Sequence, residues 1–340
     1  MCSSDLLDLG ATAAKAGEFS MRAFENGKMD LVQAEAIADL IDATSQAAAR
    51  SAVRSLQGVF STKINTVLEK LIHLRLHVEA AIDFPEEEID FLADGKILVL
   101  LDEVQDSVQA VQQSARQGQL LREGLQVVIA GKPNAGKSSL LNALAGHERA
   151  IVTDIAGTTR DVLHEKISLN GLPITLTDTA GLRETGDIVE QEGIRRAIKE
   201  IEQADLLLLV YDLNQGDEPL QLAHEYFSEH LEPKRLLLIG NKCDLTGQDA
   251  TLSVYQGFRH ISVSAKQDMG VQALIEAITA HAGFQPEEDT FIARTRHLDA
   301  MKRTQRYLAE AREQLVVFNA GELVAESLRL AQNALAEITG

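Results

Sequence analysis

Aromatic side chains and cysteines are scarce in this chain, and tryptophan is missing from it. Aromatic residues make up 4% of the 340 residues, and Cys2 and Cys243 are the two cysteines. Two cysteines so far apart provide neither a disulfide framework nor a cysteine-based metal site, which favours a reducing, cytoplasmic location. No run of 18 or more apolar residues occurs, and the start has no basic segment followed by a long apolar stretch. We therefore expect no membrane contact through a spanning segment and no secretory signal.

Positive charge is also in deficit, because 32 Lys and Arg face 51 Asp and Glu, giving a net charge of −19. This balance excludes a protein that coats nucleic acid non-specifically, since neutralising phosphates needs a basic surface. It leaves room for a local basic patch. One cluster of basic residues in the returning helical region has two interpretations. It could bind nucleic-acid phosphate or be a solvated helix face, and we favour the solvated face. Its residues are Arg294, Arg296, Lys302, Arg303 and Arg306.

Three regions differ in their hydrophobic pattern. Residues 31–119 have apolar residues at helical spacing in three runs, the second ending before Pro85 and the third at Gly118. In the middle region short apolar runs such as QVVIAG, DLLLLVYD and RLLLIGNKCD alternate with helical stretches, and after Pro286 the helical pattern returns. The sequence thus predicts a mostly parallel α/β sheet with helices on both faces, inserted into an all-α domain.

One glycine-rich loop points to phosphate binding. Residues 131–138, GKPNAGKS, fit the pattern G-x-x-x-x-G-K-[ST] between an apolar strand and a helix. Backbone N–H groups and the helix N-terminus can hold phosphate oxygens. Lys137 would reach the β- and γ-phosphates and the Ser138 hydroxyl would bind Mg2+.

Four more elements at strand ends indicate that the nucleotide is GTP. Asp178-Thr179-Ala180-Gly181 can reach Mg2+ and the γ-phosphate, and Gly157-Thr158-Thr159 supplies a switch threonine. Asn241-Lys242-Cys243-Asp244 offers a carboxylate to guanine N1 and N2, which adenine cannot match, and Ser264-Ala265-Lys266 offers an N–H to guanine O6. Together they predict a guanine-nucleotide domain over about Leu125 to Ala282.

The residue after Gly181 raises a mechanistic question. Ras-like proteins orient the attacking water with a Gln at this position, whereas this chain has Leu182. Acids of the same segment are alternatives, although most fit a solvated loop, and Arg160 and Arg183 are unproven cations. The acids are Glu184, Asp187, Glu190 and Glu192.

The motifs taken together resemble those of the MnmE (TrmE) family of tRNA modification GTPases, a branch of the TrmE-Era-EngA-like, Ras-like superfamily. The resemblance covers about Ala16 to Gly340. It includes segments outside the nucleotide domain, which separate this family from other Ras-like GTPases. The matching segments are residues 16–43, 80–91, 131–146, 150–161, 178–187 and 327–340.

The resemblance implies a set of site residues. Mg2+ would be bound by Ser138 and Thr159, and K+ by Asn134, Thr153, the Ile155 backbone and Thr158. Glu190 would be the catalytic acid that orients water, and Lys28 would touch a tetrahydrofolate derivative. The implied contacts to GTP are Asn134, Ala135, Gly136, Lys137, Ser138, Ser139, Thr153, Asp154, Ile155, Ala156, Gly157, Thr158, Thr159, Asp178, Thr179, Ala180, Gly181, Asn241, Lys242, Cys243, Asp244, Ser264, Ala265 and Lys266.

The resemblance also implies a biological role. Members of the family hydrolyse GTP as homodimers, assisted by K+, and modify the wobble uridine U34 of tRNA to 5-carboxymethylaminomethyluridine with an FAD-dependent partner of the MnmG (GidA) type. Two alternatives remain at this stage. One is a ribosome-assembly GTPase of the Era or Der kind, and the other is a GTP-binding fragment without modification activity.

The domain boundaries expected from the resemblance divide the chain into four segments. Residues 1–27 would be a remnant of a folate-binding domain after a non-matching start. Residues 28–122 and 285–340 would form the helical domain, and residues 123–284 the GTPase domain. The start MCSSDLLDL and the lack of a closing cysteine motif suggest a chain truncated at both ends.

Overall fold

The computed structural model describes residues 8–83, 95–147, 164–178, 198–227, 231–285 and 290–340. Contacts between Cα atoms divide these residues into two compact units, which are described one at a time. The helical unit contains the described residues within 8–43, 49–118 and 290–340. The sheet unit contains the described residues within 44–48 and 119–285. The boundaries proposed above at residues 27, 122 and 284 stay predictions.

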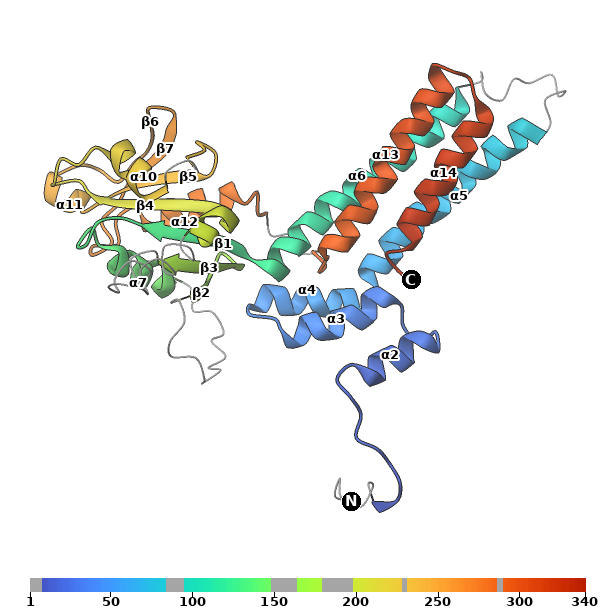
Figure 1. Cartoon of the computed structure of the whole chain (residues 1–340), viewed down its shortest axis with the longest axis horizontal. Helices are drawn as coiled ribbons and strands as arrows, with labels where there is room; N and C mark the ends of the chain where they lie inside the picture. Colours follow the sequence, from blue (N-terminus) through green and yellow to red (C-terminus); the bar gives the residue numbers. More distant parts are fainter. Residues whose placement is uncertain (1–7, 84–94, 148–163, 179–197, 228–230, 286–289) are drawn as a thin grey trace. The chain divides into compact units, whose positions relative to one another are not determined.

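The sheet unit is built on seven strands in the order β2-β3-β1-β4-β5-β7-β6 (Figure 1). Five of them run parallel, and only β2 and β6 are antiparallel to their neighbours. This mixed, mostly parallel sheet confirms the predicted fold class. The strands are β1 (Leu125–Ala130), β2 (His164–Leu169), β3 (Leu172–Asp178), β4 (Leu206–Asp212), β5 (Leu236–Asn241), β6 (Leu252–Tyr255) and β7 (Phe258–Ser262).

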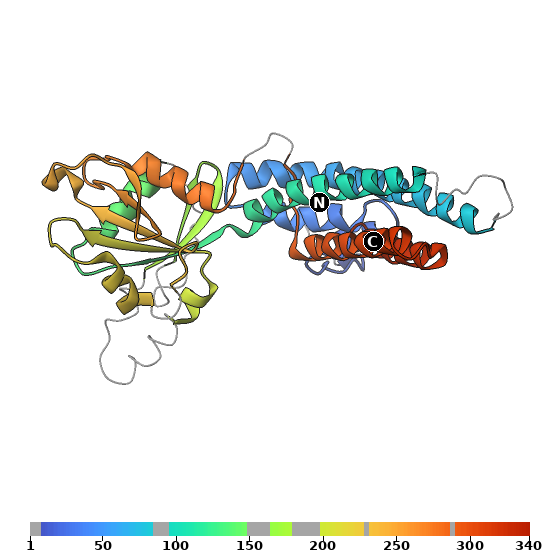
Figure 2. The ribbon, with the colours of Figure 1, turned by 90° about the horizontal axis from the view of Figure 1, so that it is seen from above.

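Helices cover both faces of this sheet. On one face α10 (Pro219–Phe227) packs Leu222 and Phe227 against alternate residues of β1, β4 and β5. On the other face lie α7 (Lys137–His147) and α12 (Val271–His281), as Figure 2 shows. The short helix α11 (Cys243–Thr246) follows β5 directly. Strands β4 and β5 are buried along their whole length, as expected for strands covered on both faces.

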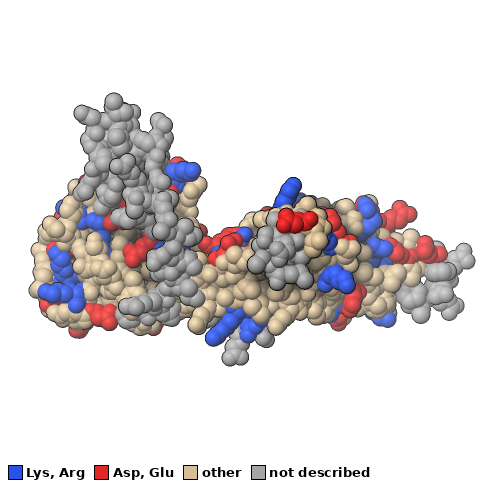
Figure 3. All heavy atoms as spheres, turned by 90° about the horizontal axis from the view of Figure 1, so that it is seen from below, with Lys and Arg blue, Asp and Glu red and all other residues tan. Residues whose placement is uncertain are grey.

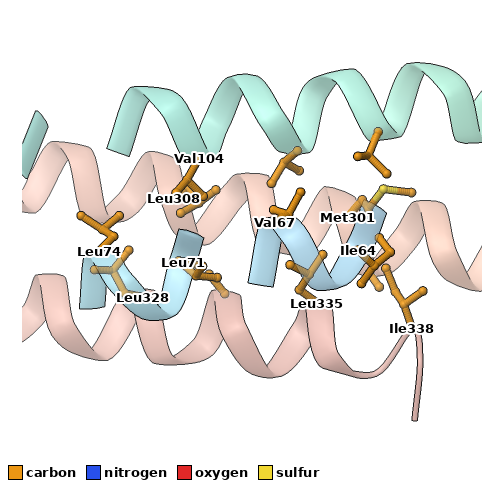
Figure 4. Close-up of a cluster of buried hydrophobic side chains, with 14 of the residues drawn as sticks. Ile64, Val67, Leu71, Leu74, Val104, Met301, Leu308, Leu328, Leu335 and Ile338 are labelled. Atoms are coloured by element: carbon orange, nitrogen blue, oxygen red, sulfur yellow. The ribbon is translucent and has the colours of Figure 1, made fainter. Parts of the chain in front are cut away.

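Four helices form the core of the helical unit: α5 (Val59–Asp83), α6 (Lys96–Glu123), α13 (Thr295–Val316) and α14 (Gly321–Ala336). In α5 the buried residues Phe60, Ile64, Val67, Leu71, Leu74 and Val78 alternate between spacings of four and three. This spacing keeps one apolar stripe turned toward the neighbouring helices, as in a coiled coil. Figure 4 shows side chains of all four helices meeting along that stripe.

The helix α6 corrects one prediction. The sequence predicts that the third helical run ends at Gly118, but α6 continues through it to Glu123. A Cβ atom at Gly118 would lie 1.8 Å from the backbone oxygen of Phe291. The glycine is therefore needed for close packing against the 290–293 segment and does not end the helix.

Three shorter helices precede the bundle: α2 (Glu18–Glu25), α3 (Leu31–Ile41) and α4 (Gln46–Leu56). Asp30 caps α3 and forms a capping box with Gln33, because each side chain accepts the other residue's backbone N–H. The continuous apolar pattern of residues 31–53 is interrupted after Ile41. There the Ser45 hydroxyl accepts the N–H of Ala48 and starts α4. No described helix is both long and apolar enough to cross a membrane.

Candidate functional site

The five parallel strands end at one edge of the sheet, and the segment after each strand carries a polar group. Registers between neighbours pair Ile129 with Asp178, Asp212 with Asn241 and Gly240 with Ser262. In open α/β sheets ligands bind outside the carboxyl ends of the strands. We therefore take this edge as the candidate site.

The loop between β1 and α7 has the geometry of a phosphate loop. Gly131 has a φ of 150° and its Cβ would lie 2.0 Å from the Val210 carbonyl oxygen of β4, so only glycine fits. Gly136 has a φ of 94°, and Asn134 is held at a φ of 64°. The Lys137 ammonium is buried and donates to the carbonyl oxygens of Gly131 (2.8 Å) and Lys132 (3.1 Å). The lysine thus lies folded over the loop that would hold phosphate.

The first turn of α7 leaves two hydroxyls accessible. Ser138 and Ser139 are exposed, while Leu140 in the same turn is fully buried. The N–H groups of this turn and the helix dipole favour an anion at this position. Ser138 thus offers an exposed hydroxyl beside a helix N-terminus that favours an anion, and its binding of Mg2+ stays a prediction.

Asn241 connects three of the predicted elements. This side chain is 2% exposed, and its Nδ2 donates to the carbonyl oxygen of Ala135 in the phosphate loop at 2.9 Å. Its Oδ1 accepts the N–H of Lys242 at 2.8 Å and that of Ala265 at 3.1 Å. One amide therefore holds three loops together. They are the phosphate loop, the Asn241-Lys242-Cys243-Asp244 loop, which we call the guanine loop, and the Ser264-Ala265-Lys266 loop.

The guanine loop is fixed from both sides. Lys242 adopts the left-handed conformation at a φ of 65°, and the N–H of Cys243 donates to the Val263 carbonyl oxygen at 3.1 Å. Burial raises the pKa of the Cys243 thiol, which packs as an apolar group. The carboxylate of Asp244 is partly exposed and accepts a hydrogen bond from Gln267 Nε2 at 3.3 Å. A partly exposed carboxylate therefore stands in this loop, and its contact with guanine N1 and N2 stays a prediction.

The Ser264-Ala265-Lys266 loop begins with Ser264, which is fully buried two residues after the end of β7. Ser264 and Met269 exchange backbone hydrogen bonds of 2.9 and 3.1 Å, closing a tight turn. Within it Ala265 is partly exposed and Lys266 exposed. Within this turn the N–H of Ala265 donates to Asn241 Oδ1 and that of Gln267 to Ser264 Oγ, and the contact of the turn with guanine stays a prediction.

Several predicted site residues lie outside the described residues. They comprise the catalytic candidate, the switch residues and the residues that follow Asp178, namely Glu190, Thr153, Asp154, Ile155, Ala156, Gly157, Thr158, Thr159, Thr179, Ala180 and Gly181. Among the described residues no group of three or more His, Cys, Asp or Glu side chains could hold a metal ion.

Two acids that no sequence motif marks contact lysines of the candidate site. Asp212, the last residue of β4, lies 2.6 Å from the Lys242 ammonium, and Asp217 lies 2.6 Å from that of Lys132. Burial opposes ionisation of Asp212, but the hydrogen bonds from Lys242 and Asn214 and the charge of Lys242 together outweigh it and lower the pKa of the carboxyl. An acid that ends the apolar run DLLLLVYD was the available signal for Asp212, whereas no pattern marks Asp217.

A buried polar pair lies beside β5. The Tyr211 hydroxyl is 2.7 Å from His260 Nε2, and Ser253 Oγ is 3.0 Å from His260 Nδ1. Burial raises the pKa of Tyr211 to about 12 and lowers that of His260. Both groups are thus neutral at pH 7, and they tie β4 to the β6–β7 hairpin across Gly240, whose missing Cβ would lie 3.1 Å from His260 Nε2.

The basic cluster in the helical unit is neutralised by acids. Arg294 pairs with Asp39, Arg296 with Glu35, and the remaining members with Asp299, Glu337 and Glu310. In Figure 3 blue and red side chains are interspersed over the described part of the visible face. These pairings favour the solvated, acid-balanced face over a phosphate-binding patch. Lys28 is exposed just before α3, and its folate contact stays a prediction.

Comparison with known proteins identifies the family. The MnmE helical domain family model matches residues 31–340. The chain belongs to the MnmE family. The tRNA modification GTPase MnmE of Acinetobacter baumannii strain AYE is 91% identical over 335 residues, which are 98% of this chain and 74% of that protein.

More distant relatives carry the same name. The MnmE of Acinetobacter baylyi is 87% identical over 98% of this chain and 72% of that protein, and that of Psychrobacter arcticus 60% identical over 98% and 73%. Among solved structures, the G domain of the T. maritima FeoB iron transporter covers 46% of this chain and 98% of its own at 27% identity. Its TM-score of 0.34 is too low to support a conclusion.

The family membership settles the coarse function. The chain is a tRNA modification GTPase, an enzyme that acts on GTP, and the phosphate and guanine loops of the sheet unit are the elements such an enzyme needs. The alternative of an Era- or Der-type ribosome-assembly GTPase is therefore wrong. The matched relatives are MnmE proteins over nearly the whole chain, including its helical regions.

Proposed function

We propose that this MnmE-family chain binds GTP at the carboxyl edge of its sheet and hydrolyses it to drive modification of the wobble uridine U34 of tRNA. The observation that carries the proposal is the Asn241 side chain. It belongs to the guanine loop and forms hydrogen bonds with Ala135 of the phosphate loop and Ala265 of the Ser264-Ala265-Lys266 loop. A nucleotide bound at this edge has its phosphates beside Lys137 and its base beside Asp244. In this arrangement, recognition of guanine and of phosphate is mechanically coupled.

The metal ions of the proposal are Mg2+ and K+. Ser138 and Thr159 would hold Mg2+, which neutralises charge on the β- and γ-phosphate oxygens. K+ would be held by Asn134, Thr153, Ile155 and Thr158, and would supply the positive charge that phosphoryl transfer requires when no arginine finger is present. The exposed, left-handed Asn134 supports this assignment, because its side chain is not committed to the packing of the loop.

The catalytic and cellular parts of the proposal follow from the family resemblance. Glu190 orients the attacking water, and two nucleotide domains pair to complete the K+ site in a homodimer. An FAD-dependent partner of the MnmG type and a tetrahydrofolate derivative near Lys28 take part in forming 5-carboxymethylaminomethyluridine on tRNA. The same membership supports action in the cytoplasm, where tRNA is modified.

Guanine recognition is tested with Asp244→Asn. An asparagine amide pairs with xanthine, which carries a carbonyl oxygen at position 2 where guanine carries an amino group. We expect affinity for GDP to fall at least 10-fold and affinity for xanthosine diphosphate to rise, measured by titration calorimetry. A variant that lost both ligands, or kept its preference for GDP, would contradict the placement of the base. Wild-type protein that failed to bind GDP would refute the function itself.

The ion assignment is tested with Asn134→Gly. Glycine tolerates the φ of 64°, so this change removes the amide oxygen without straining the loop. We expect wild-type GTP hydrolysis to be faster in KCl than in NaCl, and the variant to lose the difference while still binding GDP. Equal wild-type rates in both salts would refute the K+ site. Glu190→Gln should likewise keep GDP affinity and lose turnover.

A further inference from the structure

The strand β4 occupies a special place at the candidate site. It lies between β1 and β5 in the sheet, so its carboxyl end stands between the phosphate loop and the guanine loop. The segment that leaves β4, residues 212–218, carries no motif of its own for nucleotide binding. We call it the β4 loop.

Asp212 makes the first connection of the β4 loop. Its side chain is 7% exposed and its Oδ2 lies 2.6 Å from the ammonium of Lys242 in the guanine loop. Its Oδ1 accepts the backbone N–H of Asn214 at 2.9 Å, so the carboxylate is held at both oxygens. The four-carbon stem of Lys242 is thereby fixed at both ends, by the left-handed backbone and by this ion pair.

The other end of the β4 loop connects to the phosphate loop. Asp217 Oδ1 lies 2.6 Å from the ammonium of Lys132, the residue that follows Gly131. The hydrogen bond to Asp217 raises the pKa of Lys132, which therefore stays protonated. Next to it Glu218 accepts a hydrogen bond of 2.8 Å from the Tyr255 hydroxyl, which anchors the β4 loop to the β6–β7 hairpin.

We propose that Asp212 and Asp217 are positioning residues for the guanine nucleotide, with Asp212 acting through Lys242 on the base side and Asp217 acting through Lys132 on the phosphate side. The inference rests on the proposed nucleotide site but does not follow from it, since neither acid belongs to the loops that would touch GTP. The β4 loop fixes the side-chain conformations of both lysines before the nucleotide binds. The nucleotide then binds without having to immobilise them.

The size of the effect follows from the cost of ordering a long side chain at an interface. That cost corresponds to about a three- to tenfold change in the dissociation constant for one rotamer-rich side chain. We expect Asp212→Asn to raise the Kd for GDP by about this factor. Asp217→Asn should raise it by about two- to fivefold, because Lys132 is 42% exposed and its ion pair is screened.

The decisive experiment is a double-mutant cycle in the full chain, with GDP binding measured by titration calorimetry. If Asp212 acts through Lys242, Asp212→Asn adds less than twofold to the Kd once Lys242→Met is present. The same cycle with Asp217→Asn and Lys132→Met tests the exposed pair, where loss of folding is not expected. In steady-state GTP hydrolysis both acid variants should raise KM and leave kcat within twofold.

Asp249→Asn is the matched control, because Asp249 is an exposed carboxylate of the same unit and the change removes the same charge. Its Kd for GDP should stay within twofold of wild type. Unchanged GDP affinity in Asp212→Asn and Asp217→Asn, or effects that persist in the lysine variants, would overturn the positioning role. The GTP site would stand in that case, since Asp244→Asn tests it separately, whereas wild-type protein that does not bind GDP would refute the site.

Discussion

Glu35 in the helical unit provides a quantitative test of how this unit is held together. Its carboxylate lies 2.9 Å from Arg296 Nε and 3.2 Å from His297 Nε2, and Arg294 lies 3.6 Å away. Arg296 also donates to the carbonyl oxygens of Glu337 and Ile338. One carboxylate thus connects α3 to the start of α13 and, through Arg296, to the end of the chain. The change to make is Glu35→Gln.

The magnitude follows from the pKa of the carboxyl group. Burial alone would raise the pKa of Glu35, but the close approach of His297, the hydrogen bonds from Arg296 and the charge of Arg294 lower it from 4.5 to about 2. That difference corresponds to about 3 kcal/mol of folding free energy. Because the side chain remains 17% exposed, screening by water reduces our expectation to about 2 kcal/mol.

The pH dependence has a defined sign. Glu35 ionises near pH 4.5 in the unfolded chain and near pH 2 in the folded chain, so its stabilisation is complete above about pH 5. It is lost as the pH falls from about 4.5 to about 2. The difference in unfolding free energy between wild type and Glu35→Gln should therefore be constant from pH 6 to 8 and shrink toward zero in acid.

The assay uses the absence of tryptophan. In a Tyr307→Trp background the single indole reports on the helical unit alone, since Tyr307 packs against the four-helix core. Urea unfolding followed by this fluorescence separates the helical unit from the sheet unit, which a whole-chain signal would not do. Glu313→Gln, on the exposed side of α13, is the control and should change stability by less than about 0.5 kcal/mol. A difference for Glu35→Gln that did not depend on pH would refute the ion-pair account.

Three further outcomes follow from close packing. Gly118→Ala should destabilise the helical unit by about 2 kcal/mol or more in the same assay, because the alanine Cβ would clash with the Phe291 carbonyl. Alanine normally favours a helix, so increased stability would contradict this contact. Gly136→Ala should abolish GDP binding in calorimetry, since its Cβ would lie 2.2 Å from Asn241 Nδ2, and retained affinity would show that the loop can shift. Leu71→Ala, at a fully buried position of the bundle, should cost about 2–5 kcal/mol in urea unfolding, and a cost below about 1 kcal/mol would contradict the packing.

The elements that the sequence predicted best are buried strands and helices whose local hydrophobic pattern matches their surroundings in the fold. Strands β3 and β5 are apolar runs that end in Asp178 and Asn241, and β1 is followed directly by Gly131, so the motif at each of these strand ends is visible without a structure. The paired spacings of three and four in α5 and α13 mark helices with one buried stripe. In both cases a local pattern and the tertiary environment agree.

The elements that the sequence did not predict depend on distant contacts. The edge strand β6 exposes Leu252 and Val254 and has no buried periodicity, so it is recognisable only through its pairing with β7. Gly118 resembles a helix end unless the Phe291 backbone is known to lie against it. Likewise, the partner of Arg294 is Asp39, which is 255 residues away in the chain. No local pattern reports contacts over such separations.

The distribution of charge around the nucleotide site has a consequence for how GTP is held. Lys132 and Lys242 are both paired with acids of the β4 loop, which agrees with the positioning role proposed for them. Among the described residues, the Lys137 ammonium instead donates to two neutral carbonyl oxygens. Those contacts do not neutralise the charge of Lys137, which in the proposed function is the charge that meets the phosphates. In a chain with a net charge of −19, the proposed site would thus offer the Lys137 ammonium and the loop N–H groups to the anion, while Lys132 and Lys242 fix the loops on either side of it.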